Sequence, residues 1–246
     1  MALKNHIPNT VTAMNLLSGV IAVIFTFEGR LDVAFCLMLL AAVFDFCDGL
    51  CARMLHAYSN IGKELDSLSD MVSFGVLPAL MLHVLMRMNG MDCWLCWVPL
   101  AIAVFSALRL AKFNVDERQG SSFLGLATPA CAIICGSLAC LALKEPGFWL
   151  PAFFLRYCWA IPVLALVLSA LLVSEIPMFA MKIAPGHSIF DAPRVIFLVW
   201  AVFSLIAPFA FGLHWSLFPL LLFLGYIVEN CIFAIGCKTD ARSGRA

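Results

Sequence analysis

Eight apolar stretches constrain this chain more than any other feature of its sequence. Each is close to 20 residues long, the length that an α-helix needs to cross the hydrocarbon core of a bilayer. None has the period-2 alternation of a transmembrane barrel strand. Hydrophobic residues make up 63% of the 246 residues and charged residues 12%, against about 25% charged in soluble domains. The sequence therefore predicts an all-α integral membrane protein, with spans at 11–28, 32–55, 66–88, 94–115, 122–143, 152–173, 191–211 and 214–236.

The basic residues predict how these spans are oriented. On one side of the eight spans lie Lys4, Arg53, Lys63, Arg109, Lys112, Arg118, Lys182, Arg194, Lys238, Arg242 and Arg245; on the other lie Arg30, Arg87, Lys144 and Arg156. The positive-inside rule places the richer side in the cytosol. We therefore expect a multi-pass protein of the cell (inner or plasma) membrane with both termini cytosolic. The net charge of zero gives no basic field for nucleic acid.

One short segment interrupts the apolar pattern with a dense set of charges. Asp45 and Asp48 are spaced i, i+3 and share one face of the second span, whereas Asp66 and Asp70 are spaced i, i+4. We expect the second pair on the first turns of the third helix, with Met54–Leu65 as the connection that folds the two helices together. Ionised carboxylates at membrane depth are costly and mark functional sites. The four aspartates are therefore predicted to converge on the cytosolic side.

Four converging carboxylates predict a site for divalent cations. Mg²⁺ and Mn²⁺ prefer carboxylate oxygens, and two such ions would clamp a diphosphate during displacement at phosphorus. Gly49 and Ala52 remove side-chain bulk where a phosphate would approach, and Arg53 can bind phosphate oxygens in bidentate fashion. Asp70 is the candidate general base for an incoming hydroxyl. The alternative is that the aspartates cap helices or pair with nearby basic residues, which the number of charges in one register disfavours.

These residues follow the pattern DxxDGxxAR, eight residues, then GxxxDxxxD, which resembles the signature of the CDP-alcohol phosphotransferases. That family transfers a phosphatidyl or phosphoalcohol group from a CDP-linked donor to a hydroxyl and releases CMP. The resemblance implies a six-helix catalytic core in residues 1–182, with two additional transmembrane helices and a cytosolic tail in residues 183–246. It also implies two divalent ions held by the four aspartates, with Asp70 as base, and a homodimer.

Further stretches resemble one branch of the family, the bacterial membrane-type phosphatidylserine synthases. They are 7–12, 15–19, 62–75, 109–114, 123–130 and 174–177. The branch implies CDP-diacylglycerol as donor and L-serine as acceptor. Contact with the CDP moiety is implied for Asn9, Thr12, Gly49, Ala52, Arg53 and Gly62, and contact with the acceptor or the lipid phosphate for Arg109, Lys112 and Asn114. Ala127 departs from the branch's usual proline and Lys112 from its arginine, which weakens the serine assignment without affecting the metal motif.

Other interpretations remain open on the sequence alone. The acceptor could be glycerol 3-phosphate or an inositol phosphate, although an additional phosphate calls for more cations than Arg109 and Lys112 supply. Those two residues could instead be anchors at the membrane surface, and Asn114 could cap its helix. A transporter or channel that conducts cations past the aspartates is a third possibility, which the GxxxDxxxD register and Arg53 disfavour. The last two spans have no assigned role.

Overall fold

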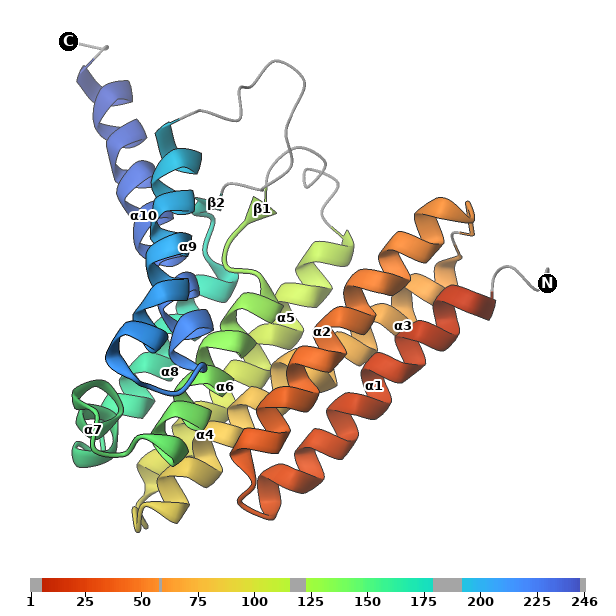
Figure 1. Cartoon of the computed structure of the whole chain (residues 1–246). Coiled ribbons are helices and arrows are strands. Elements are labelled where there is room, and N and C mark those ends of the chain that lie inside the picture. The colour runs from red at the N-terminus through yellow and green to blue at the C-terminus, as the bar shows by residue number, and fades with distance from the viewer. Residues whose placement is uncertain (1–5, 58, 116–122, 179–191, 244–246) are drawn as a thin grey trace.

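The computed structural model describes residues 6–57, 59–115, 123–178 and 192–243, and its elements are almost entirely helical (Figure 1). In chain order they are α1 (His6–Phe27), α2 (Leu31–Met54), α3 (Asn60–Asp70), η2 (Met71–Val76), α4 (Leu77–Met88), η3 (Trp94–Leu100), α5 (Ala101–Val115), β1 (Phe123–Leu124), α6 (Thr128–Lys144), α7 (Trp149–Arg156), α8 (Ala160–Val173), β2 (Pro177–Met178), α9 (Ala192–Phe211) and α10 (Leu217–Ser243). The strands β1 and β2 form one short antiparallel pair. The predicted all-α class is otherwise confirmed.

The long helices lie side by side and alternate in direction along the chain (Figure 1). α1 and α2 form an antiparallel pair on one flank, and α9 and α10 form a second pair on the other flank, against α6. α6 is the most buried helix of the described part, and small residues dominate it. At Gly136 an added Cβ would lie only 2.3 Å from Cε of Met38 and 2.7 Å from the ring of Phe35, both on α2. Small residues of this kind let membrane helices approach closely.

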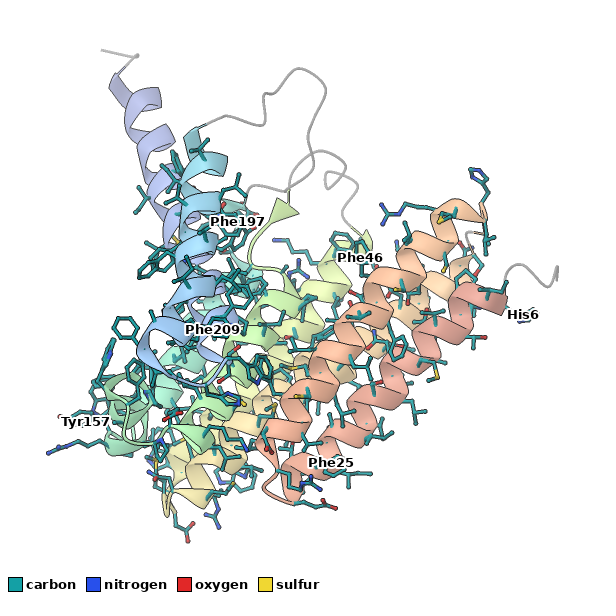
Figure 2. The ribbon with its side chains drawn as sticks, viewed as in Figure 1. His6, Phe25, Phe46, Tyr157, Phe197 and Phe209 are labelled. Carbon is teal, nitrogen blue, oxygen red and sulfur yellow. The ribbon has the colours of Figure 1, made fainter. Side chains whose placement is uncertain are left out.

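Four helical segments are long and apolar enough to cross a membrane: His6–Phe27, Leu31–Met54, Asn60–Met88 and Trp94–Val115. α6 and α7 would together make a fifth, although they bend by 96° where they join. A multi-pass membrane protein is therefore confirmed, whereas the count of eight spans stays a prediction. Large side chains such as Phe46 on α2 and Phe209 on α9 project outward from these helices, as expected for surfaces that face lipid (Figure 2).

The structure divides the expected span 152–173 into two helices. α7 ends at Arg156, and α8 begins at Ala160. The break occurs because Tyr157 adopts an extended backbone conformation, and its ring packs against Phe153 and Trp159. Aromatic rings of this kind are typical of the membrane interface. The proposed boundary between residues 182 and 183, and Lys182 itself, lie outside the described residues.

Gly19 lies at a close approach between α1 and η2. A Cβ at this position would lie 2.3 Å from Oγ and 3.0 Å from Cα of Ser73, so backbone would have to move. We expect Gly19→Ala to lower the free energy of unfolding by about 1–3 kcal/mol, the usual cost of overpacking, seen as a lower melting temperature in detergent. Gly147→Ala is the matched control, because no atom lies within 4 Å of the added Cβ. Equal melting temperatures for the two variants would contradict the close packing.

Candidate active site

The corner between α2 and α3 is shorter than the sequence predicted. α3 begins at Asn60, and Ser59 caps it: the Ser59 side chain accepts a hydrogen bond of 3.0 Å from the backbone N–H of Gly62. The expected connection Met54–Leu65 is therefore wrong in its second half. The residues that follow Ser59 are polar, but they are helical because Ser59 caps the start of α3. Asp66 consequently lies in the second turn of α3, and Asp70 is its last residue.

Three of the predicted carboxylates meet at this corner. One oxygen each from Asp45, Asp48 and Asp66 lies within 4.8 Å of the others. Asp48 is buried, and the other two are half-buried. Oδ2 of Asp48 and Oδ1 of Asp66 are buried without a hydrogen-bond partner among the described residues. Clustered carboxylates with unsatisfied oxygens need a cation, so this donor set fits a hard divalent metal ion.

Asp70 lies outside that group of three and is bound by α1 instead. Its Oδ1 accepts a hydrogen bond of 3.2 Å from Nδ2 of Asn15. The π-helix η2 follows directly after Asp70, and π-helical turns inside α-helices are rare and frequent at functional sites. Asp70 still interacts electrostatically with Asp45, Asp48 and Asp66, so it lies beside the group of three and gains a partner from another helix.

A line of polar contacts joins α1 to α3 and η2. Oγ of Ser69 donates to the carbonyl of Thr12 at 3.3 Å, and Oγ of Ser73 donates to the carbonyl of Asn15 at 3.2 Å. Sequence reasoning did not assign Asn15 to the site. The sequence could have indicated Asn15, because Thr12, Asn15 and Gly19 follow the i, i+3, i+7 spacing of a single helix face. This face positions α1 against the end of α3.

A pocket of about 210 Å³ opens beside the carboxylates. Its wall contains five of the residues predicted to contact CDP together with two of the aspartates: Asn9, Thr12, Gly49, Ala52, Gly62, Asp48 and Asp66. Pro8, Ala57, Ser59 and Lys63 complete the wall and were not predicted. At Gly62 an added Cβ would lie 2.9 Å from Oδ1 of Asn9, so glycine there keeps the pocket's two sides close. The small residues leave room for a ligand against the helix backbone.

Arg53 does not line this pocket in the structure. Its side chain is exposed and folds back along α2, where Nε donates to the carbonyl of Gly49 at 3.0 Å. The guanidinium therefore lies next to a pocket residue, Gly49, without belonging to the pocket wall. The sequence could place Arg53 one turn after Gly49, but it could not predict the rotamer of an exposed side chain.

The three predicted acceptor residues are not brought together at the pocket. Asn114 donates from Nδ2 to Oγ of Ser67 at 2.9 Å, and its carbonyl accepts from Nζ of Lys63 at 3.1 Å; it thereby ties α5 to α3. Lys112 is exposed and pairs with Glu175 at 3.6 Å, and it is not among the residues of the pocket wall.

Arg109 differs from these two residues because it retains a free buried donor. Its Nη1 donates to Oγ1 of Thr128 at 2.8 Å, whereas its Nε is buried without a partner among the described residues. The guanidinium also interacts electrostatically with Asp70. Arg109 is therefore the predicted acceptor residue whose surroundings best suit an anionic ligand next to Asp70.

Comparison with known proteins identifies the family. Residues 5–171 match the model of the CDP-alcohol phosphatidyltransferase family. The CDP-diacylglycerol–serine O-phosphatidyltransferase of Mycobacterium tuberculosis is 34% identical over 216 residues, which cover 82% of this chain and 71% of that protein. The archaetidylserine synthase of Methanothermobacter thermautotrophicus is 33% identical over 69% of this chain and 68% of that protein. With the carboxylate cluster in place and the match spanning most of the length, the chain belongs to the CDP-alcohol phosphatidyltransferase family.

Proposed function

We propose that this protein transfers the phosphatidyl group of CDP-diacylglycerol to the hydroxyl of L-serine, giving phosphatidylserine and CMP. The observation that carries the reaction class is the meeting of Asp45, Asp48 and Asp66 beside a pocket walled by glycine and alanine. Support for the acceptor comes from the relatives, which are named for transfer to serine in Mycobacterium tuberculosis, Mycobacterium leprae and Bacillus subtilis.

The carboxylates would hold the metal ions of this reaction. Asp45, Asp48 and Asp66 would bind a first divalent ion, and Asp70 would help to bind a second, either Mg²⁺ or Mn²⁺. When bound, such ions supply positive charge that stabilises the diphosphate oxygens as negative charge develops on them. The unsatisfied oxygens of Asp48 and Asp66 support this assignment.

The pocket would bind the CDP portion of the donor. Gly49, Ala52 and Gly62 allow phosphate and ribose to lie against helix backbone, and Asn9 and Thr12 offer polar contacts from α1. Lys63 adds a positive charge to the same wall. Arg53 would leave the carbonyl of Gly49 and bind phosphate oxygens, an exchange that its exposed position allows.

Asp70 would act as general base towards serine. It takes the proton of the serine hydroxyl, and the serine oxygen forms a bond to the lipid-side phosphorus. The bond between that phosphorus and the bridging diphosphate oxygen breaks, and CMP leaves with the bonding electrons. Arg109, which interacts electrostatically with Asp70, would bind the serine carboxylate with its planar guanidinium.

The remaining expectations concern the membrane and the assembly. The carboxylate corner lies at the same end of the bundle as the C-terminal ends of α5 and α10 (Figure 1), which the basic residues assign to the cytosol. We therefore propose a cytosol-facing active site, where serine is accessible. We also propose a homodimer, and a division into a catalytic core (1–182) and an added helical pair with its tail (183–246).

Release of CMP from CDP-diacylglycerol by the purified protein tests the function. With Mg²⁺ or Mn²⁺ present, we expect release to depend on L-serine and to be at least about tenfold slower with glycerol 3-phosphate or an inositol phosphate, because a site built for one polar group rejects ligands that leave it unpaired. Preference for another acceptor would keep the reaction class and discard serine. Absence of release with all three acceptors would contradict the proposed function.

A further inference from the structure

Asn15 carries a buried side-chain amide in the middle of a membrane helix. The nitrogen of this amide has a hydrogen-bond partner, whereas the oxygen has none among the described residues. The exposed fraction of Asn15 is 0%. Nδ2 donates to Oδ1 of Asp70 at 3.2 Å, whereas Oδ1 of Asn15 is buried and has no hydrogen-bond partner in the described part of the chain. Buried carbonyl oxygens without a donor are rare in folded proteins, so this atom needs an explanation.

The position of Asn15 is determined by contacts on both sides of it along α1. One turn earlier, the carbonyl of Thr12 accepts from Ser69; at Asn15 itself the carbonyl accepts from Ser73. One turn later, Gly19 lies against Ser73 with no room for a Cβ. The amide therefore cannot move away from Asp70 without disrupting the packing of α1 on α3 and η2.

The hydrogen bond to Asp70 fixes which way the amide points. The Asn15 NH₂ group donates to the Asp70 carboxyl group, so the amide oxygen, which can only accept, lies on the other branch and is left without a partner among the described residues. An alcohol that loses its proton to Asp70 has to lie beside the same carboxylate. In serine the carbon next to the hydroxymethyl group carries an ammonium, which has three donors and no acceptor. The unpartnered Oδ1 of Asn15 is a suitable acceptor for one of them.

We propose that Asn15 positions Asp70 through its Nδ2 and recognises the ammonium group of the acceptor through its Oδ1. This inference rests on the proposed function, since it assumes an amino alcohol as acceptor. Arg109, which also interacts electrostatically with Asp70, then binds the acceptor's carboxylate, so that the two polar groups of serine have separate partners. Asn15 becomes a residue that determines acceptor specificity, contributed by α1 and distinct from the pocket wall.

The test compares serine with 3-hydroxypropionate, which has the same hydroxyl and carboxylate but no ammonium. Two variants are used. Asn15→Leu has similar size and no polar atoms, and Asn15→Ser is a smaller change whose hydroxyl can bond to its own helix backbone. Thr26→Val is the matched control, because Thr26 is also fully buried in α1 but bonds only to the carbonyl of Ala22 among the described residues.

We expect both Asn15 variants to lower kcat with serine about 10- to 100-fold, the range for losing a hydrogen bond to a charged group. The ratio of kcat/KM for serine to that for 3-hydroxypropionate should fall about tenfold or more. The KM for CDP-diacylglycerol and the affinity for CMP should stay within about twofold of wild type, and Thr26→Val should behave as wild type.

Three results would overturn the inference while leaving the proposed function intact. The first is wild-type kcat in both variants. The second is a lower kcat with an unchanged ratio between the two acceptors, and the third is a lower kcat with weaker CMP binding; either of these would mark Asn15 as structural. If Asn15→Leu fails to fold, Asn15→Ser decides between these outcomes. A wild-type protein that releases CMP with other acceptors but not with serine would overturn the inference and the proposed acceptor together.

Discussion

Replacing Asp48 by asparagine should abolish metal-dependent release of CMP. Asp48 is the most buried of the three clustered carboxylates, and one of its oxygens has no partner among the described residues. Its loss should lower kcat by about three orders of magnitude, since metal stabilisation of charge is worth several kcal/mol. Direct binding of Mn²⁺, followed by electron paramagnetic resonance, should weaken in parallel.

The same substitution should raise the melting temperature of the metal-free protein. Three carboxylates this close together repel one another when no cation is present, and a neutral amide removes part of that repulsion. Asp32→Asn is the matched control, because Asp32 lies near the other end of α2 and pairs with Lys144 at 2.7 Å. If Asp48→Asn bound Mn²⁺ as tightly as the control, the cluster would not be the metal site.

Replacing Asp70 by asparagine should separate catalysis from binding. Losing a general base costs about 10²- to 10⁴-fold in kcat. CMP affinity should change little, because Asp70 is not part of the pocket wall. Inhibition by CMP measures that affinity, and single-turnover kinetics measure the chemical step.

Asp92→Asn provides the comparison for Asp70→Asn, since Asp92 is an exposed residue between α4 and η3, beyond the far end of the span Asn60–Met88, and pairs with Arg87. A wild-type rate for Asp70→Asn would show that Asp70 is not the general base. A loss of CMP affinity as large as the loss of rate would instead indicate that Asp70 organises the whole site.

The part of the site that the sequence predicted is the part that local helix geometry determines. Asp45 and Asp48 are one turn apart on one helix, so any helix places them together. Asp66 joins them because a short connection folds α3 back onto α2, which brings the first turns of α3 beside the last turns of α2. Gly49 and Ala52 follow on the same helix and therefore appear in the pocket wall. The pattern of four aspartates was sufficient for this much.

The remainder depends on contacts between distant segments, which spacing does not encode. Asn15 meets Asp70 across 55 positions of the chain. Asn114, expected near the acceptor, bonds to Ser67 across 47 positions of the chain. The start of α3 was missed by six residues because polar residues early in a helix resemble a loop when only hydropathy is considered. The bend after α6 has a local cause instead, since it falls at Pro146 and Gly147, which interrupt the helix.

The π-helix after Asp70 has a consequence for how this membrane segment tolerates changes in length. A π-turn contains one residue more than an α-turn, so Met71–Val76 holds a surplus residue between two regular helices. Deleting one residue there leaves Asp66 and Asp70 on one side, and the buried face of α4 on the other, in their present alignment. A deletion elsewhere within Asn60–Met88 rotates the two parts by about 100° relative to each other, the angle per residue of an α-helix. The segment directly after Asp70 is therefore the place where this helix can lose a residue without rotating the clustered carboxylates relative to α4.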